Sequence, residues 1–242
     1  MWGFIKGAVN AVADAVAGAV HTIWSGVKAI IAFVFGLPDF VLALFGIYLP
    51  KKIRVEAMIL VDEHRQPVAA RDEVQEALEL ANAEYKEQMN VRVIFLSRDP
   101  VIIPEIPPPS VLVHSCWPDA FTDTFAEAGR WLRQHAISLP IRSQIGWGSP
   151  VTVFVIRNVT GDKNGCSAGM LADYVVIDPD ALDTQKGPEG KRLTLAHEVG
   201  HACRLVWHQN NTLMRADWHG RPRRLTRLQK ALFRSSGHVS YF

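Results

Sequence analysis

Hydrophobic residues in the first fifty positions recur every three or four residues, the spacing of one face of an α-helix. Small residues repeat at four-residue spacing in the same segment, as they do where helices pack closely. Few side chains ionise before residue 50, whereas charges occur regularly after it. We therefore expect a hydrophobic helical module over residues 1–50 and a second domain over residues 51–242. The apolar stripe comprises Ile5, Val9, Val12, Val16, Val20, Ile23, Val27, Ile30 and Val34.

The last part of this module, residues 29–49, would be about 31 Å long as one helix, roughly the thickness of a bilayer core. Pro38 and Asp39 lie near its middle, where a bilayer makes an aspartate cost about 2.5–3.5 kcal/mol. We expect a helix break there and a helical hairpin that dips into a membrane or packs in a larger assembly. The alternative is a hairpin buried against the second domain. Because Asn10 and Asp14 interrupt any early apolar core, we expect no cleavable signal peptide. The hydrophobic module leads us to expect a membrane-associated or exported protein.

Beyond residue 50, strand-like and helix-like segments alternate. Alternation and apolar runs predict strands over residues 51–64, 91–97, 150–159 and 173–182, with a short exposed strand within 161–171. Helical periodicity predicts helices over residues 71–89, 118–136 and 190–207. Strands and helices that alternate within one domain predict an α/β or α+β fold with a mixed sheet.

Composition narrows the classes of function. Of the 242 residues 48% are hydrophobic, enough for a sizeable core, and the formal net charge is +2. So small a charge gives no reason to expect nucleic acid as a partner. The three cysteines, Cys116, Cys166 and Cys203, follow no CxxC spacing and do not fix the redox compartment.

The stretch TLAHEVGHACRLVWHQNNTLM (194–214) contains His-Glu-x-x-His. In a helix, His197 and His201 lie on one face and can bind one metal ion, for which Zn²⁺ is the expected cofactor. Glu198 lies beside that ion, where its carboxylate can take a proton from a bound water.

The third ligand is not decided by spacing. No glutamate follows Glu198, which leaves His208, Asp217, His219 and His238 as candidates. In a continuous helix His208 would lie about 10 Å along the axis from His201, too far to share an ion. If His208 is the ligand, the helix must therefore end before it.

The stretch resembles the active site of the metzincin clan of zinc metallopeptidases, whose pattern is His-Glu-x-x-His-x-x-Gly-x-x-His followed by a methionine turn. Arg204 stands at the position of the glycine, and one extra residue precedes the third histidine. The order of elements over residues 53–242, including a C-terminal helix, is also similar. The resemblance implies a zincin/metzincin-like catalytic domain in which the corresponding residues are His197, Glu198, His201, His208 and Met214.

From this resemblance we expect the helix to end within 204–207, Asn210 and Asn211 to form a tight turn, and Met214 to lie beneath the ligand imidazoles. Asp217 remains the rival ligand. His219 or Tyr241 is a candidate for stabilising the oxyanion.

These residues together predict a zinc endopeptidase that acts on a protein or peptide substrate. The substrate would extend along an exposed edge strand, whose candidate residues are Gly165, Cys166, Ser167, Ala168 and Gly169. A hydrophobic module joined to a peptidase is compatible with a delivered or membrane-associated toxin. The alternative function is a membrane-inserting or assembly component whose metal site is degenerate or structural.

Overall fold

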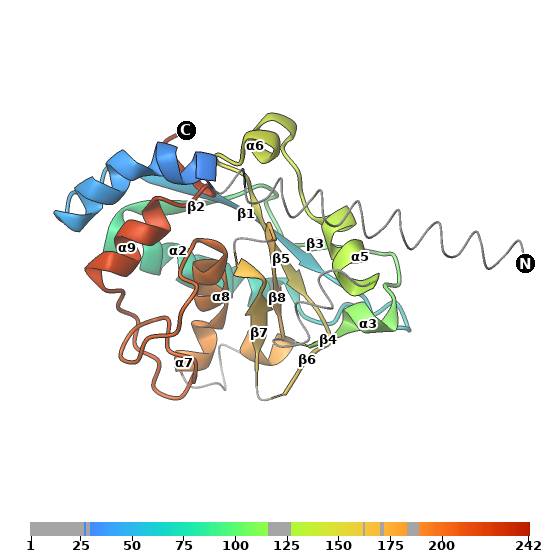
Figure 1. Ribbon diagram of the computed structural model, residues 1–242. Coiled ribbons are helices and arrows are strands. Elements are labelled where there is room, and N and C mark those ends of the chain that lie inside the picture. Colours follow the sequence, from blue (N-terminus) through green and yellow to red (C-terminus); the bar gives the residue numbers. More distant parts are fainter. Residues whose placement is uncertain (1–26, 28–29, 116–126, 162, 170–171, 183–188) are drawn as a thin grey trace, which may run out of the picture.

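One mixed sheet forms the centre of the molecule (Figure 1). The computed structural model describes residues 27, 30–115, 127–161, 163–169, 172–182 and 189–242. The sheet order is β2 (Val91–Phe95), β1 (Lys51–Ile59), β5 (Val151–Val155), β8 (Tyr174–Ile177) and β7 (Gly165–Ser167). The first four of these strands are parallel, and β7 runs antiparallel to β8 at the edge. The mixed, mostly parallel sheet confirms the predicted class.

Short strands extend this arrangement. Both β3 (Val101–Ile102) and β9 (Val239–Ser240) pair with β1, in parallel and antiparallel orientation respectively. A separate parallel pair joins β4 (Val113–Ser115) to β6 (Asn158–Thr160). The strand predicted over residues 150–159 is therefore divided between β5 and β6.

Helices cover both faces of the sheet. Buried side chains along β1 and the residue after it point alternately into two hydrophobic cores, one on each face. Ile53 and Val55 face a core that includes α2 (Arg71–Met89) and α8 (Thr194–Ala202). Met58 and Leu60 face a second core with α3 (Pro109–Leu112) and α5 (Glu127–His135). Further helical elements are α6 (Pro140–Ile145), η2 (Pro179–Ala181), α7 (Glu189–Arg192), α9 (Arg227–Arg234) and a helix over residues 30–44.

The long amphipathic helix predicted over residues 71–89 has those bounds in α2. The helix predicted over residues 190–207 is divided into α7 and α8, and it ends earlier than expected, at Ala202. The helix predicted over residues 118–136 is present as α5 from residue 127, and its earlier part lies outside the described residues.

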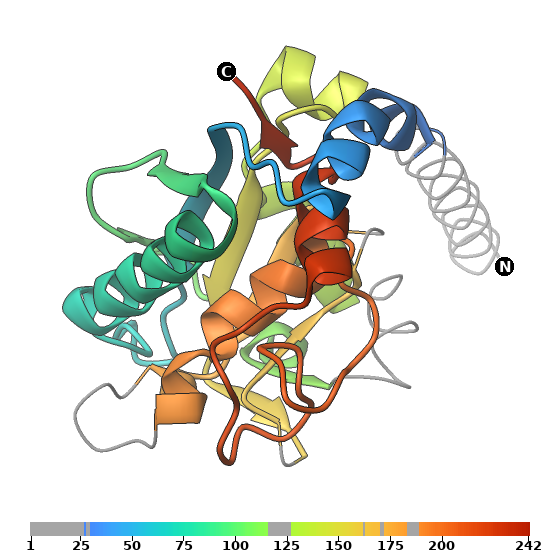
Figure 2. The same ribbon diagram turned by 90° about the vertical axis from the view of Figure 1, so that its left-hand side faces the viewer.

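The predicted break at Pro38 and Asp39 is wrong, because residues 30–44 are continuously helical. This helix lies beside α9 (Figure 2). Asp39 is 2% exposed and binds Arg234 in an ion pair, an interaction that offsets the hydrogen bond lost at Pro38. The hairpin that was predicted to bend at Pro38 is therefore not formed at that position. Most of the predicted apolar stripe, residues 1–26, lies outside the described residues. Among the helices that are described, none combines the length and apolarity needed to cross a membrane.

Candidate metal centre

The His-Glu-x-x-His stretch lies on α8, one of the most buried helices that the structure describes. Leu195, Ala196 and Val199 pack into the core under the sheet and are each 1% exposed. This packing fixes the helix, so that His197 and His201 project from its other side, one turn apart. The buried apolar face therefore determines where the two imidazoles point.

Three histidines meet at one point. The Nε2 atom of His201 lies 3.0 Å from Nε2 of His197 and 3.2 Å from Nε2 of His208. Nitrogen ligands about 2.0–2.1 Å from a tetrahedral zinc ion would be about 3.3 Å apart. His197, His201 and His208 also form the one group of potential metal ligands found among the described residues.

Backbone carbonyls set the orientation of two of these rings. Nδ1 of His197 lies 2.9 Å from the carbonyl oxygen of Leu213, and Nδ1 of His201 lies 2.5 Å from that of Leu205. Because a carbonyl oxygen can only accept, each Nδ1 carries the proton and each Nε2 keeps a free lone pair. This is the usual outer-shell arrangement around histidine ligands of zinc, and the donor set fits that ion.

Burial keeps these imidazoles neutral, as metal binding requires. Desolvation lowers the pKa of His197 well below 6.5 and that of His201 to about 4, and the nearby positive charges act in the same direction. The pKa of the more exposed His208 is also lowered, with burial again the main cause. At neutral pH the three Nε2 atoms are therefore available as ligands.

The end of α8 explains how His208 returns to the group. Arg204 adopts the left-handed conformation with a φ of 73°, and the Leu205 N–H donates to the carbonyl of Gly200. A residue with a side chain thus occupies the conformation that glycine usually supplies at a helix C-terminus. The expectation that the helix stops before His208 is confirmed.

The turn that leads to Met214 packs against α8. Asn211 is left-handed, with a φ of 59°, as expected for a tight turn. Met214 is fully buried, and a Cβ added to Gly200 would lie 2.9 Å from its sulfur. The turn therefore packs directly against α8 between the two ligand positions, and the preceding carbonyl of Leu213 orients His197.

Glu198 stands next to the histidine group. Its Oε1 lies 4.0 Å from Nε2 of His197, and the residue is 6% exposed. Burial raises the pKa of its carboxyl to about 8, although the charge of Arg221 acts in the opposite direction. A divalent cation held by the histidines would favour the carboxylate and lower this pKa.

Arg221 is a part of the site that the sequence interpretation missed. Arg221 is 7% exposed and donates to Thr194 Oγ1 and to the carbonyl of Arg215. Desolvation lowers its pKa to about 10, which leaves it charged at neutral pH. It therefore joins the loop after Met214 to the first turn of α8. No local pattern reveals a contact between side chains 27 residues apart.

The predicted substrate strand lies beside the glutamate. A Cβ added to Gly165 would be 2.9 Å from Cγ of Glu198, so β7 passes directly over this side chain. Gly169 has a φ of 60°, and its added Cβ would lie 4.0 Å from the His201 carbonyl. Cys166 is disulfide-bonded, whereas Cys203 is free and buried. Ser167 and Ala168 complete the candidate stretch between the two glycines.

The other candidate ligands lie elsewhere. Asp217 accepts from the backbone and ring nitrogens of His219, on an exposed part of the loop. Nδ1 of His238 lies 2.9 Å from the carbonyl oxygen of Ser149, and its Nε2 lies 3.7 Å from Oδ1 of Asp173. None of Asp217, His219 and His238 belongs to the histidine group.

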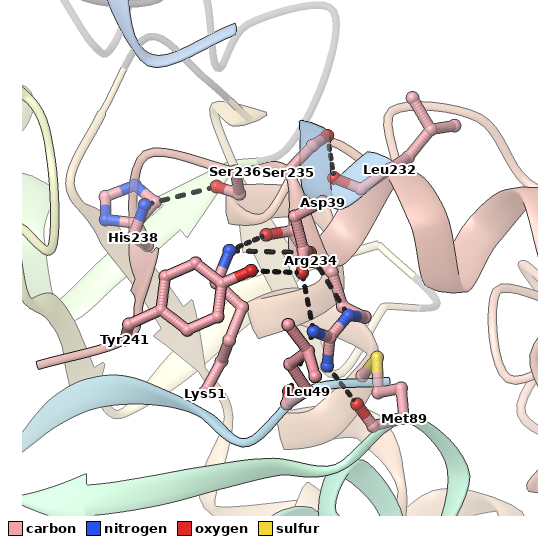
Figure 3. Close-up of polar contacts among 10 residues, drawn as sticks. All are labelled: Asp39, Leu49, Lys51, Met89, Leu232, Arg234, Ser235, Ser236, His238 and Tyr241. Atoms are coloured by element: carbon pink, nitrogen blue, oxygen red, sulfur yellow. Dashed lines mark hydrogen bonds and ion pairs between the residues drawn. The ribbon is translucent and has the colours of Figure 1, made fainter. Parts of the chain in front are cut away.

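Tyr241, proposed as an oxyanion stabiliser, donates its hydroxyl to Asp39 at 2.8 Å (Figure 3). The same Asp39 carboxylate forms ion pairs with Arg234 and Lys51, so the Tyr241 hydroxyl belongs to this buried cluster. The placement of Tyr241 gives no support to a role at the metal site. His219 is exposed and stacked on Trp218, and nothing in its contacts favours the oxyanion role.

The chain matches no protein-family model, and it has no significant match among curated protein sequences.

Proposed function

We propose that the protein is a zinc-dependent endopeptidase with a metzincin-like catalytic site. The observation that carries this proposal is the convergence of three Nε2 lone pairs beside the Glu198 carboxylate. Two rings are fixed by carbonyls, and the third comes from the segment beyond the helix end. Three neutral nitrogens leave a tetrahedral zinc ion one open position, as catalytic zinc sites require.

The chemistry divides between the metal and the chain. His197, His201 and His208 would hold the zinc ion, which when bound would supply Lewis acidity and activate a water. The Glu198 carboxylate would act as the general base that accepts a proton from the attacking water and as the acid that returns it to the leaving amine. Arg221 adds a fixed positive charge that favours the ionised form of Glu198. The turn at Met214 keeps the ligands aligned by packing on Gly200.

The substrate class follows from the edge strand. β7 is the last strand in the described sheet order, and an extended peptide can add to an edge strand as a further strand. Because Gly165 lies against Glu198, a peptide paired with β7 would place its backbone near the proposed base. The disulfide at Cys166 is of a kind that persists in oxidising compartments, which supports action outside a reducing cytosol.

The decisive experiment compares Glu198→Gln with the wild-type chain. The variant keeps the shape of the side chain but removes the base, so zinc content should stay at one ion per chain while cleavage of an unfolded protein falls at least about 100-fold. Glu87→Gln, a change on the exposed surface of α2, is the matched control and should retain activity.

Undiminished cleavage by Glu198→Gln would overturn the mechanism. A wild-type chain that holds zinc but cleaves no unfolded protein would instead indicate a structural metal site, the alternative function. Removal of zinc by a chelator should abolish cleavage by the wild-type chain, and added zinc should restore it.

A further inference from the structure

Lys163 lies at the start of the edge strand, close to the proposed base. The ladder between β7 and β8 continues before Gly165, because the Asp178 N–H donates to the carbonyl of Asn164 at 2.9 Å. Lys163 directly precedes this pair and is two residues from Gly165, whose added Cβ would lie 2.9 Å from Cγ of Glu198. Two residues of an extended chain span only about 7 Å. The strand pairing therefore holds Lys163 near the candidate metal centre.

The positive charge of Lys163 acts on both the base and the third histidine. Burial is the main influence on Glu198, whose pKa it raises to about 8, and the charges of Arg221 and Lys163 act against this rise. Burial also lowers the pKa of His208, and the same two charges lower it further. Lys163 therefore lies within electrostatic range of both Glu198 and His208.

Of these two basic residues, Lys163 is the one that can reach a substrate. Arg221 is 7% exposed, and its guanidinium donates to Thr194 and to two backbone carbonyls. Lys163 is exposed, and within the described parts of the chain its side chain has no ion pair or hydrogen-bonding partner. Its ammonium group, on a flexible four-carbon stem, can turn toward a carboxylate brought by a ligand.

Acidic side chains that could neutralise this charge are scarce. Between residues 199 and 242 the sequence holds eight lysine and arginine residues and one acidic residue, Asp217. Asp217 is already ion-paired with Arg215. The charges that act on Glu198 from the described part of the chain, Arg221 and Lys163, are both positive. Because charges of one sign around a site attract ligands of the opposite sign, the surroundings favour a substrate that brings a carboxylate.

We propose that Lys163 determines substrate specificity by binding an acidic side chain of the peptide within two residues of the scissile bond. The assignment rests on the proposed peptidase function and names the class of its substrate, an acidic peptide. A peptide that pairs with β7 at Gly165 has its backbone beside Glu198, and its residues one or two positions away lie next to Lys163. An aspartate or glutamate there is attracted by the ammonium group, whereas a lysine or arginine is repelled.

The sheet edge favours a polypeptide over a nucleic acid as the source of the negative charge. β7 runs beside α8 at the end of the described sheet order (Figure 1). Such an edge recognises an extended peptide through main-chain hydrogen bonds. A nucleic-acid backbone lacks the alternating N–H and C=O groups that this pairing requires.

Cleavage profiling of a mixed peptide library tests the specificity. The zinc-loaded wild-type protein is incubated with the library, and mass spectrometry identifies the cleaved bonds. Acidic residues should be enriched over basic ones by about 5-fold or more within two residues of those bonds, since an exposed ion pair is replaced by a repulsion of similar size. Lys163→Glu should reverse this preference, and Lys163→Met should abolish it. Arg92→Glu, on the exposed side of β2 at the opposite edge of the sheet, is the matched control and should keep it.

Peptide binding without turnover separates the specificity from the peptidase activity. In a Glu198→Gln background, fluorescence anisotropy compares a labelled alanine–glutamate peptide with its alanine–lysine counterpart. The glutamate peptide should bind about 5-fold more tightly or better, and Lys163→Glu should invert the order. Melting temperature shows that each variant is folded.

Equal cleavage and binding of acidic and basic peptides by the wild-type chain would overturn the role of Lys163 and leave the peptidase function standing. An unchanged preference in Lys163→Glu would do the same. A chain that cleaves no peptide but binds the glutamate peptide through Lys163 would support the acidic-peptide site and contradict the peptidase function. Tighter binding of a single-stranded RNA oligonucleotide than of the glutamate peptide would overturn the choice of peptide as the ligand.

Discussion

At the scale of single residues, the third ligand decides what the site can bind. Two histidines one turn apart on a helix are compatible with several kinds of metal site, and a carboxylate or an imidazole can complete them. Nε2 of His208 lies 3.2 Å from Nε2 of His201, whereas Asp217 is occupied by His219 on the exposed part of the loop. The geometry thus favours an all-histidine set.

We expect His208→Ala to weaken zinc binding more than the roughly 10- to 100-fold typical of losing an outer-shell partner, since a direct ligand is removed. Asp217→Ala is the control and should leave the dissociation constant for zinc unchanged, because this exposed carboxylate binds His219 in its own loop and not the histidine group. Competition with a chromogenic chelator measures both constants. Full zinc affinity in His208→Ala would contradict the assignment.

The identity of His197, Glu198 and His201 as a group could be predicted from the sequence, because their spacing in a helix fixes their relative positions. The role of Arg204 could not. A left-handed arginine costs about 1–2 kcal/mol relative to the ordinary conformation, and only the completed structure around it stabilises this state. A sequence shows which residue stands at a helix end but not the tertiary packing that forces its conformation.

At the scale of elements, the contact between α8 and the turn at Met214 holds the site together. Gly200 leaves no space for a side chain, since an added Cβ would lie 2.9 Å from the buried Met214 sulfur. We expect Gly200→Ala to lower the free energy of unfolding by about 1–3 kcal/mol through overpacking.

Chemical denaturation measures this effect, and a double-mutant cycle provides the control. In a Met214→Ala background the space is open, so Gly200→Ala should cost much less there. Equal costs in the two backgrounds would show that the helix and the turn are not in the contact that the structure describes.

Element boundaries were predictable where local chemistry sets them. At the start of α2 the Ala70 N–H donates to the Glu73 side chain, and at its end Asn90 is left-handed, with a φ of 53°. The helix over residues 30–44 was predicted incorrectly, because Pro38 signals a local break that a distant ion pair overrides. Hydrophobic periodicity reports only the local preference of the chain for a helix or a break. Whether Asp39 is buried with a charged partner depends on Arg234, far along the chain.

At the scale of the whole molecule, the cluster around Asp39 joins the two ends of the described chain. Arg234, which binds Asp39, is 195 residues away in sequence, and Lys51 donates to the Arg234 carbonyl at 2.7 Å. The charge pattern of the sequence gives no means to pair these residues. The boundary predicted at residue 50 therefore does not separate residues 39–49 from the domain in space, since Asp39 and the Leu49 carbonyl both bind Arg234.

The cluster predicts a pH dependence of stability. Burial, the largest cause, lowers the pKa of Lys51 from 10.5 to about 8, although Asp39 opposes this shift. Between these two pH values the folded protein binds fewer protons at Lys51 than the unfolded chain does. The free energy of unfolding should therefore gain up to about 3 kcal/mol from this group as the pH rises from 8 to 10.5.

Denaturation at several pH values in this window measures the effect. The difference between the wild-type chain and Lys51→Met isolates the group and should grow with pH by about that amount. Lys52→Met changes the exposed neighbour and should keep the wild-type rise. A constant difference between the wild-type chain and Lys51→Met would contradict the account of the cluster.

The most direct test of the metal centre is zinc-edge X-ray absorption of the purified protein. We expect one zinc ion per chain with three imidazole nitrogens at about 2.0–2.1 Å and one light oxygen ligand. These nitrogens belong to His197, His201 and His208, so His208→Ala should show only two imidazoles. A spectrum with two imidazoles in the wild-type chain, or a preparation that binds no zinc, would contradict the central claim.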